Sequence, residues 1–547
     1  MLRVTYFWKY LLPGREVVLV IDLTQIAAFG YMIKIRCTSS KFNSDKNLFI
    51  CCVLNISWYY KPKTEDNILM KRTIFDIFLI TTVATGLFTL NSFMNMPDDS
   101  RHKYQHPAEM NYQNFCAGCH GHNLEKFAAK AWMDETGNTS AIQSITYGIE
   151  DIGMPAFRKT FTNAEIEALA SYVKKGIPAD KSKLKPAVKP GGIVESETQR
   201  FVLDTVVTGL KVPWGLAFLP NGDLLISERS GTLHRFSNGK LSSPIEGLPP
   251  IMAFGQGGLL DLCLHPDYEK NGWIYMSYSA LNTESKKRIG NTAVLRARLK
   301  GNKLADVQVI FRGTPDTDRG HHFGCKLVFD KEGHLFFGVG ERGQHFDFPQ
   351  NLNNTNGKIH RINDDGTIPA DNPFVNTPGA IPSIYSYGHR NPQGTAIHPV
   401  TGELWASEHG PKGGDELNLI KPGLNYGWPV ISYGINYDGT ILTSFKEKEG
   451  MEQPVYYWIP SIGPCGMTFV TGDRYKNWNN NILLGSLSFQ YLERVVIQGH
   501  AVVHREKLLE DIGRVRNVVM GPDGYIYVAI ETPGKILRLI PVADDKK

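Results

Sequence analysis

The chain has little net charge and no regular cysteine framework. A formal net charge of +5 over 547 residues is small, so the composition gives no support for nucleic acid as a partner. Three of the eight cysteines, Cys263, Cys325 and Cys465, stand singly without framework spacing, and we interpret them as small buried hydrophobic residues. No residue class is extreme, and an apolar content of 42% is typical of globular proteins. At this length two or more domains are expected.

The first 69 residues contain apolar patches but no sustained apolar span. The next segment begins at Met70 with two basic residues and then an apolar run, as an export signal does. Asp76 interrupts this pattern, and no clean small-x-small cleavage site follows it. Residues 70–95 are therefore predicted to be a signal peptide or an uncleaved membrane anchor, in a periplasmic or otherwise exported protein. Residues 1–69 form an unexplained extension, and the simplest interpretation is that translation starts at Met70.

A haem-attachment motif lies within residues 100–178. Cys116, Cys119 and His120 form C-A-G-C-H, in which two thiols can add to the haem vinyl groups while the imidazole binds the iron. A short motif of this kind also occurs in zinc sites, but no second C-x-x-C is present in this segment. The later stretch DIGMPAF offers Met154 as a second iron ligand. An iron with His and Met ligands has a raised potential and no open position, which suits electron transfer.

A predicted helix closes this part of the chain. Thr162 and Glu165 form a capping box, apolar residues recur after them at helical spacing, and Gly176 ends the run. Residues 105–178 resemble a small class I cytochrome c, an all-α domain. The resemblance implies haem c attached through the two cysteines, with the histidine as proximal and the methionine as distal iron ligand. A Lys- and Pro-rich stretch without periodicity, residues 179–199, is predicted to be a linker.

From residue 200 to residue 543 one pattern recurs, a short apolar strand, a Pro/Asp/Gly turn and a second apolar strand. The six copies are GLAFLPNGDLLIS, LLDLCLHPDYEKNGWIYMSY, KLVFDKEGHLFFGVG, GTAIHPVTGELWAS, GMTFVTGDRYKNWNNNILLGS and NVVMGPDGYIYVAI. Spacings of roughly 45 to 70 residues predict an all-β six-bladed propeller with variable loops, in which radial closure protects the sheet edges. A large β-sandwich with similar hairpins is the alternative.

Three stretches of the repeat region carry polar groups that a plain blade does not need. RGHHFGCK places two histidines ahead of an apolar strand, and YSYGHRNPQG places His389, Arg390 and Asn391 on a loop. SEHGPKGGDELN gathers three acidic residues around glycines and a proline, a backbone that can turn its carbonyls toward a hard cation such as calcium. Loops at one end of a scaffold are where functional sites collect.

Taken together, these stretches resemble the soluble glucose dehydrogenase and aldose sugar dehydrogenase family, six-bladed propellers that hold pyrroloquinoline quinone (PQQ) and calcium. The resemblance runs in order through VPWGLAFLPNG, GQGGLLDLCLHPDY, HFGCKLVF, GKIHRINDDGTIPADNPF, YGHRNPQG, EHGPKGGDELNLIKPGLNYGWP and GRVRNVVMGPDGYIYV. It implies a PQQ-dependent sugar dehydrogenase, an oxidoreductase acting on CH–OH groups.

The resemblance also implies roles at single positions. His322 matches the general base that removes the sugar hydroxyl proton as hydride passes to the quinone, a task that suits an imidazole. Gln256 matches a glutamine that contacts the substrate. Arg390 and Asn391 match the pair beside the quinone oxygens, where a cation stabilises charge as the quinone is reduced.

The remaining matches concern cofactor and metal binding. The backbone carbonyls of Gly410 and Pro411 match ligands of the calcium at PQQ. Arg514 and Arg516 match arginines that pair with the cofactor carboxylates, a bidentate task for which lysine is a poor substitute. Three residues match a second, structural calcium site: Asp415, Glu416 and Tyr426.

Four positions depart from the family pattern. Ser488 stands where a lysine is expected to contact the quinone, so one positive contact is missing. His321 stands where an acidic residue is expected before the base. Ser461 replaces a threonine contact to PQQ, and Ile459 replaces an aromatic residue of the glucose pocket. These departures bear on cofactor affinity and on substrate identity.

The sequence therefore predicts an exported quinoprotein that oxidises an aldose sugar to its lactone and passes the electrons to its own c-type haem. Fusion would give the acceptor an effective concentration of about a millimolar for a short linker, and a downstream cytochrome or respiratory chain would then accept the electrons. One alternative is a quinone-less propeller that binds a sugar or glycan while tethered to a cytochrome, which Ser488 favours and His322 and the arginines disfavour. Another is an enzyme of the same chemistry acting on an alcohol or a glycan end group.

Overall fold

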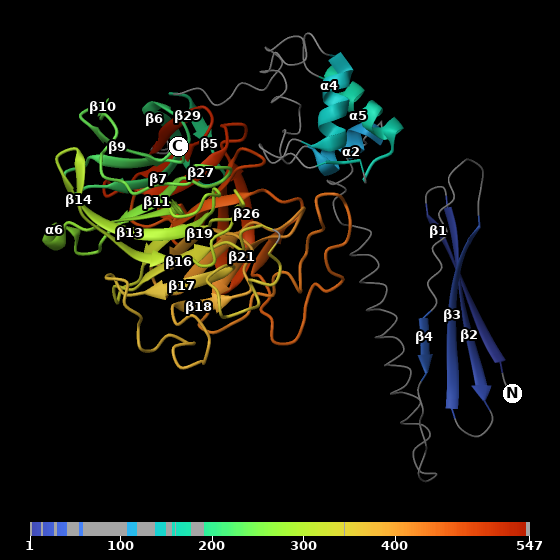
Figure 1. The fold of residues 1–547 in the computed structure, drawn as a ribbon. Coiled ribbons are helices and arrows are strands. Elements are labelled where there is room, and N and C mark those ends of the chain that lie inside the picture. The colour runs from blue at the N-terminus through green and yellow to red at the C-terminus, as the bar shows by residue number, and fades with distance from the viewer. Residues whose placement is uncertain are drawn as a thin grey trace. The chain divides into compact units, whose positions relative to one another are not determined.

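The computed structural model describes residues 3–12, 15–26, 30–40, 54–57, 107–116, 137–148, 156–158, 160–176, 191–343 and 345–542. The chain divides into two compact units, Met1–Lys103 and Tyr104–Lys547 (Figure 1). The predicted signal or anchor segment, residues 70–95, lies outside the described residues. Within the described ranges, no helix combines the length and the apolar character needed to cross a membrane.

The first unit contains an antiparallel sheet of four strands in the order β1-β2-β3-β4. The strands are β1 (Arg3–Leu12), β2 (Arg15–Ile26), β3 (Gly30–Ser40) and β4 (Leu54–Ser57). They are rich in β-branched and aromatic residues, as in REVVLVIDLTQI, which suits a pleated sheet. The sequence interpretation did not predict this sheet, because apolar patches without a sustained period indicate no particular element.

In the described residues, the second unit begins with the helices α2 (Pro107–Phe115), α4 (Gly137–Tyr147) and α5 (Asn163–Gly176). The predicted capping box at the start of α5 is confirmed. Glu165 Oε2 accepts a hydrogen bond from the Thr162 backbone N–H at 2.8 Å, and Thr162 Oγ1 accepts one from the Glu165 N–H at 3.3 Å. The apolar face of α5 packs on the other two helices in a small core of its own: Tyr112, Ala141, Ile145, Phe157, Phe161, Ile166, Leu169, Ala170 and Val173.

Six antiparallel sheets follow, and their innermost strands contact one another in a closed ring from β7 through β11, β15, β19, β23 and β27 back to β7. Blade 1 contains β7 (Pro213–Phe218), β8 (Leu224–Glu228), β9 (Thr232–Ser237) and β10 (Lys240–Leu241); blade 2 contains β11 (Leu259–Leu264), β12 (Ile274–Leu281), β13 (Gly290–Lys300) and β14 (Lys303–Arg312). Blade 3 contains β15 (Leu327–Phe329), β16 (Leu335–Val339), β17 (Lys358–Ile362) and β18 (Ile384–Tyr387). The predicted six-bladed propeller is confirmed.

The last three blades complete the ring (Figure 1). Blade 4 contains β19 (Pro392–Ile397), β20 (Leu404–Glu408), β21 (Asp415–Ile420) and β22 (Tyr456–Trp458); blade 5 contains β23 (Pro464–Phe469), β24 (Ile482–Ser486), β25 (Leu492–Gln498) and β26 (Ala501–Leu508). Blade 6 contains β27 (Val515–Met520), β28 (Ile526–Ile530), β29 (Gly534–Pro541), β6 (Arg200–Leu210) and β5 (Ile193–Glu195). Two short helices, α6 (Tyr268–Asn271) and η4 (Lys476–Trp478), lie between the first two strands of blades 2 and 5.

Each copy of the sequence repeat forms the first two strands of one blade. The second strand is fully buried in five of the blades, at β8, β16, β20, β24 and β28. Such a strand has a neighbouring strand on each side and a neighbouring blade on each face, so both of its faces must be apolar or internally paired. This environment explains why the repeat reads as an apolar run and not as an alternating pattern.

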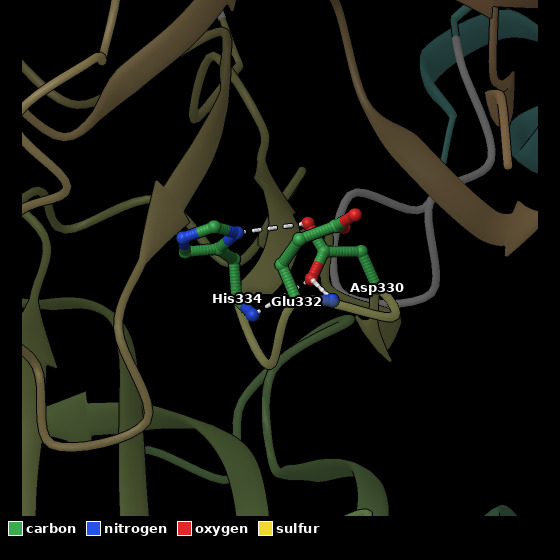
Figure 2. A group of neighbouring side chains, drawn as sticks. All are labelled: Asp330, Glu332 and His334. Carbon is green, nitrogen blue, oxygen red and sulfur yellow. Dashed lines mark hydrogen bonds and ion pairs between the residues drawn. The ribbon is translucent and has the colours of Figure 1, made fainter.

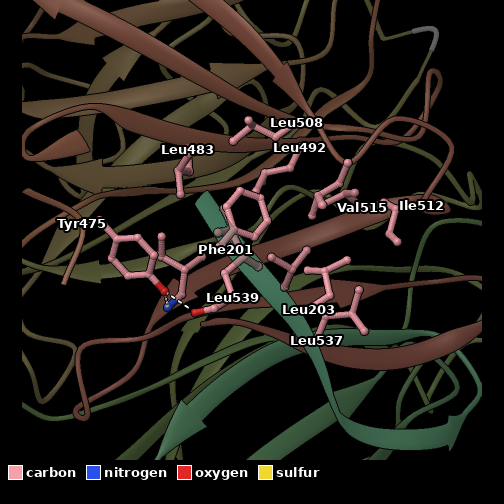
Figure 3. Packing of buried hydrophobic residues seen from close by; sticks show 14 of the residues in the cluster. Phe201, Leu203, Tyr475, Leu483, Leu492, Leu508, Ile512, Val515, Leu537 and Leu539 are labelled. Carbon is pink, nitrogen blue, oxygen red and sulfur yellow. Dashed lines mark hydrogen bonds between the residues drawn. The ribbon is translucent and has the colours of Figure 1, made fainter. Parts of the chain in front are cut away.

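Blade 6 closes the ring by pairing the two ends of the propeller. Strand β6 runs antiparallel to β29, with Leu203 opposite Leu539 and Leu210 opposite Gly534. Phe201 and Leu203 of β6 pack between C-terminal strands, and the Tyr475 hydroxyl donates to the Leu539 carbonyl oxygen (Figure 3). Full burial of such side chains stabilises the fold by about 1.5–3 kcal/mol each. The closure therefore depends on residues more than 300 positions apart.

Candidate active site

The blade topology places the predicted propeller residues at one end of the ring. In an antiparallel blade the start of the first strand and the end of the second strand lie at the same edge. Residues at the start of a first strand are Gln256, His322, Arg390, Asn391, Ser461, Arg514 and Arg516, and residues after a second strand are Glu341, Gly410, Pro411 and Ser488. Loops that are far apart in sequence can therefore supply one site.

His322 is bound to a buried carboxylate that the sequence interpretation did not identify. Its Nδ1 lies 2.5 Å from Glu341 Oε1, and Glu341 is only 1% exposed. Burial and the nearby Arg390 lower the pKa of His322 to about 4, which the Glu341 carboxylate only partly opposes. Burial works against ionisation of Glu341, yet His322 and Arg390 hold its pKa below the usual value. Near neutral pH the pair is thus a neutral imidazole beside a carboxylate.

This pairing defines the tautomer of His322. An ionised carboxylate can only accept hydrogen bonds, so the Nδ1 of the neutral ring must carry the proton and Nε2 keeps its lone pair. Gln256 supports the same residue, because its Oε1 accepts a hydrogen bond from the His322 backbone N–H at 2.9 Å. The side-chain oxygen of Gln256, predicted to contact the substrate, is thus engaged with the base loop.

Arg390 and Asn391 lie beside this pair and are both buried. The Arg390 guanidinium donates to the His409 carbonyl oxygen at 3.0 Å, and Asn391 Oδ1 accepts from the Gly324 N–H at 3.1 Å. Two donors of the pair, Arg390 Nε and Asn391 Nδ2, have no hydrogen-bond partner among the described residues. An unsatisfied buried donor costs about 1–3 kcal/mol. These groups therefore favour a bound acceptor.

Arg514 and Arg516 share one carboxylate at the centre of the ring. Arg516 Nε donates to Glu531 Oε1 at 2.6 Å, and Arg514 Nε donates to Glu531 Oε2 at 2.8 Å. The Arg516 guanidinium also lies 3.7 Å from the ring centre of Trp214. Burial opposes ionisation of Glu531, but the two arginines hold its pKa well below the usual value, and Arg229 contributes. The guanidinium groups of Arg229, Arg514 and Arg516 thus all act on the Glu531 carboxylate.

The loop after β20 carries the predicted calcium ligands. The backbone N–H of Gly410 donates to Asp415 Oδ1 at 2.8 Å, and the Ser461 hydroxyl donates to the Pro411 carbonyl oxygen at 2.9 Å. A Cβ at position 410 would lie 2.1 Å from the Gly414 carbonyl oxygen, so this tight turn requires glycine. Ser461 therefore lies next to one of the two predicted carbonyl ligands.

The three residues predicted to hold a second calcium have separate partners. Asp415 is 1% exposed and accepts backbone hydrogen bonds from Gly410 and Gly463 (Oδ2 at 2.7 Å), and burial raises its pKa to about 6. Burial and the neighbouring Glu408 raise the pKa of Glu416. The Tyr426 hydroxyl donates to the Leu419 carbonyl oxygen at 2.6 Å. The second calcium site stays a prediction, with Asp415 already bracing the loop.

Comparison with known proteins identifies the propeller. The family model described as glucose/sorbosone dehydrogenase matches residues 210–538. Aldose sugar dehydrogenase YliI of Escherichia coli (strain K12) is 42% identical over 337 residues, which is 60% of this chain and 90% of that protein. The chain belongs to the glucose/sorbosone dehydrogenase family. It is accordingly an oxidoreductase.

The names of two further similar proteins refer to a quinone cofactor. Quinoprotein glucose dehydrogenase B of Acinetobacter calcoaceticus is 33% identical over 433 residues, covering 64% of this chain and 89% of that protein. The PQQ-bound form of an aldose sugar dehydrogenase from Streptomyces coelicolor is similar in structure, with a TM-score of 0.51, 31% identity and coverage of 62% of this chain and 98% of that one. Residues 105–173 match a second family model, described as cytochrome c oxidase, cbb3-type, subunit III.

The residues of this family member fit a quinone that carries carboxylates. Arg514 and Arg516 supply positive charge for carboxylates, and the unpartnered donors of Arg390 and Asn391 suit carbonyl oxygens. Ser488 lies at the same end of the ring, where its backbone N–H donates to the Ile462 carbonyl oxygen at 2.9 Å. Ser488 is uncharged, so this position adds no positive charge to that of Arg390, Arg514 and Arg516.

The haem ligands are described only in part. Cys116 directly follows α2, and its backbone N–H donates to the Tyr112 carbonyl oxygen at 2.8 Å. Cys119, His120 and Met154 lie outside the described residues, so their roles stay predictions. Of the single cysteines, Cys325 and Cys465 are buried as predicted, whereas Cys263, near the end of β11, is only partly buried and packs against a hydrophobic cluster.

One group outside the site also gathers metal-binding side chains (Figure 2). Asp330, Glu332 and His334 lie in the turn between β15 and β16, at the end of the ring opposite the predicted site. Asp330 Oδ1 accepts from the backbone N–H groups of Glu332 at 3.0 Å and His334 at 2.8 Å, and Asp330 Oδ2 lies 2.9 Å from His334 Nδ1. These bonds stabilise the hairpin turn and account for the group without an ion.

Two features of the site escaped the sequence interpretation. Glu341 and Glu531 follow the second strands of blades 3 and 6. Each is the acidic residue directly after an apolar repeat, in GVGE and VAIE. Their position in the repeat was therefore a usable signal, because the end of a second strand lies at the edge where the site forms.

Proposed function

We propose that this protein oxidises an aldose sugar to its lactone with PQQ as cofactor and passes the electrons to a c-type haem held by residues 105–178. The observation that carries the proposal is the 2.5 Å contact between His322 Nδ1 and Glu341 Oε1. It places a neutral imidazole with a free Nε2 beside the buried cation Arg390. General bases of this kind contribute about 10²- to 10⁴-fold to a rate.

Bound PQQ would supply the acceptor for the hydride that leaves the anomeric carbon. His322 Nε2 accepts the proton of the anomeric hydroxyl in the same step, so the sugar loses one hydride and one proton and becomes a lactone. The Glu341 carboxylate stabilises the imidazolium that forms, through the Nδ1–H bond. Arg390 and Asn391 would direct donors at the growing negative charge of the cofactor, and Arg514 and Arg516 would hold its carboxylates.

Calcium at the carbonyls of Gly410 and Pro411 would orient the cofactor and polarise it. Hard carbonyl oxygens are suitable ligands, and Ser461 holds the Pro411 carbonyl in place through its hydroxyl. The proposed enzyme is exported and passes its electrons to a downstream acceptor. Its haem is attached through Cys116 and Cys119, with His120 and Met154 as the proposed iron ligands. Support for the haem comes from the family match over residues 105–173.

Reconstitution of the full chain tests the proposal. Purified protein loaded with PQQ and calcium should reduce its own haem when an aldose is added. One molecule of lactone should form for every two electrons transferred. His322→Ala should abolish haem reduction by sugar while dithionite still reduces the haem normally. Retained turnover in that variant would refute the assignment of the base.

The Ser488 substitution favours a second candidate, a propeller that binds sugar or glycan without a quinone. A PQQ titration monitored by quenching of tryptophan fluorescence separates the two candidates, since only the enzyme should bind PQQ in the micromolar range or tighter. Sugar binding without PQQ binding would establish the binding module. A substrate panel of aldoses, polyols, alcohols and oligosaccharides on the haem-reduction assay then decides the substrate class.

A further inference from the structure

The segment Gly340–Gly343, with the sequence G-E-R-G, contacts both loops of the candidate active site. The Glu341 backbone N–H donates to the Arg390 carbonyl oxygen at 2.9 Å, while its side chain binds His322. At Gly340 an added Cβ would lie 2.2 Å from the His322 carbonyl oxygen and 2.8 Å from Asn391 Oδ1. The segment is thus packed directly between the base loop and the Arg390 loop.

Arg342 is the most unusual member of this segment. It is 0% exposed, although it carries a guanidinium, and it lies among the largest fully buried side chains of the described residues. Both hydrogen-bond partners of its guanidinium are backbone carbonyl oxygens, and neither is a carboxylate. Its Nη2 donates to the Arg319 carbonyl oxygen at 2.7 Å, and its Nη1 donates to the His321 carbonyl oxygen. Burial lowers its pKa to about 9, so the residue is retained at a considerable cost.

The third contact of Arg342 is with an aromatic ring. Its guanidinium carbon lies 3.4 Å from the ring centre of Phe323. Arg319, His321 and Phe323 are alternate residues of one loop, and His322 lies among them. The contacts of Arg342 therefore surround the base without touching its imidazole.

The backbone at the base is one that needs such support. His322 has a φ of 53°, in the left-handed region that a non-glycine residue rarely adopts. A residue in this conformation costs about 1 kcal/mol or more, and the surrounding structure has to over-determine it. Two carbonyl hydrogen bonds and a ring contact from one rigid guanidinium supply that constraint, which the flexible single ammonium of lysine would not reproduce.

We propose that Arg342 is a positioning residue that holds the 319–323 loop, so that His322 keeps its hydrogen bond to Glu341 and presents Nε2 to the substrate. This inference rests on the proposed function for its catalytic consequence but not for its structural one. Adjacent residues then divide the task. Glu341 sets the tautomer of the imidazole, and Arg342 sets the backbone that carries it.

The structural consequence can be measured without cofactor or sugar. In the full chain labelled with ¹⁵N-histidine, His322 should show the neutral form with the proton on Nδ1, assigned by its loss in His322→Gln. In Arg342→Met the resonance should become a mixture of both neutral tautomers, because the bond to Glu341 is no longer enforced. An unchanged single tautomer in a folded Arg342→Met variant would overturn the proposal.

The kinetic consequence is a loss in kcat at nearly constant KM. Misplacement of a reacting group by about 1 Å can cost ~10²-fold in rate, so Arg342→Met should lower kcat to that extent with PQQ affinity unchanged. Arg342→Lys can replace only one of the two hydrogen bonds to carbonyl oxygens, so its kcat should lie between those of the wild type and Arg342→Met. If Arg342→Met does not fold, Arg342→Lys and Phe323→Leu carry the same test, and wild-type kcat and tautomer in both would also overturn it.

Arg298 provides a matched control. Its Nε donates to the Asn271 carbonyl oxygen at 2.8 Å, and its guanidinium carbon lies 3.9 Å from the ring centre of Trp273. Arg298→Met thus removes the same two kinds of contact from blade 2, together with an ion pair to Asp306 at 3.0 Å, and should leave tautomer and kcat unchanged. A failure of the proposed function would appear differently, as a wild-type protein that has the predicted His322 tautomer but no sugar-dependent haem reduction.

Discussion

Glu531 accepts a 2.6 Å hydrogen bond from Arg516 Nε at the centre of the ring, where both residues are at most 5% exposed. The same carboxylate binds Arg514 at 2.8 Å. Removing one partner of a buried ion pair costs about 3–5 kcal/mol, because the remaining charge is left uncompensated. Glu531 therefore neutralises part of a cationic centre that otherwise repels itself.

The first prediction follows from this charge balance. Glu531→Gln should destabilise the PQQ-free protein by about 3–5 kcal/mol, and added PQQ should recover more stability than it does in the wild type, because its carboxylates replace the missing charge. Thermal unfolding with and without PQQ measures both effects. Glu506→Gln is the control, since Glu506 is also buried and paired with Arg494 at 2.7 Å, but in blade 5. Equal PQQ effects in the two variants would contradict the prediction.

The second prediction concerns the pH dependence of activity. With a His322 pKa of about 4, kcat/KM should be constant near neutral pH and fall tenfold per unit below about pH 4, where the base becomes protonated. The Glu341 carboxylate raises this pKa, so Glu341→Gln should move the acid limb to still lower pH. The same variant should lose about 10²-fold or more in kcat, because the imidazolium loses its counter-charge.

This prediction is measured with an artificial acceptor, over the pH range in which the circular dichroism stays native. An acid limb near pH 6.5 in the wild-type enzyme would mean that burial and Arg390 do not lower the pKa of His322. A limb that moves to higher pH in Glu341→Gln would contradict the assigned direction.

The third prediction links three buried histidines to stability. Burial lowers the pKa of His360 to about 3 and of His322 to about 4, and the pKa of His409 lies well below the usual value for the same reason. The unfolded chain protonates these residues near pH 6.5, before the folded protein does. The contribution of these histidines to stability should therefore be complete above pH 6.5 and should fall as the pH decreases from there toward 4, by up to about 1.4 kcal/mol per pH unit for each histidine.

Urea unfolding at pH 7, 6 and 5 tests this linkage. His360→Gln should lose less stability per pH unit than the wild type does, by the contribution of one histidine, since glutamine does not titrate. His500→Gln is the matched control, because the His500 side chain is 57% exposed. The same pH dependence in His360→Gln as in the wild type would contradict the prediction.

The fourth prediction concerns the departure at Ser488. Ser488→Lys places a cation at the edge of the site, close to Gly463, where an added Cβ would lie 3.1 Å from Ser488 Oγ. A hydrogen bond from a charged group contributes about 1.5–3 kcal/mol, so PQQ should bind about tenfold more tightly or better. Thr283→Lys, at an exposed position of blade 2, controls for the added charge. Unchanged or weaker PQQ affinity would show that this position does not face the cofactor.

The sequence repeats were sufficient to predict the propeller, because each reports a local environment. In β8, β16, β20, β24 and β28 every residue is buried, and this requirement appears directly as an apolar run followed by a turn. The capping box of Thr162 and Glu165 was predictable for the same reason, since its two partners are three residues apart. The sheet β1 to β4 was not, because its patches have no period that indicates one element.

The site was predictable only where a motif marks it. Resemblance identified His322, Arg390, Arg514 and Arg516, and their positions at one end of the blades agree with a common site. It did not reveal Glu341, Glu531 or Arg342, which bind these residues or their loops. Gln256, predicted to contact substrate, binds the His322 backbone in the described structure.

The sequence by itself determined the repeated strands, the turns between them and the chemistry of the side chains near each turn, since these depend on neighbours along the chain. Only the tertiary structure decided which charges meet. Closure of the ring pairs β6 with β29 and brings separate blades to a common centre, where Glu531 lies between Arg514 and Arg516 and Glu341 meets His322. The pKa values there result from burial and from charges on other segments, and a local sequence pattern predicts neither the burial nor the neighbouring charges.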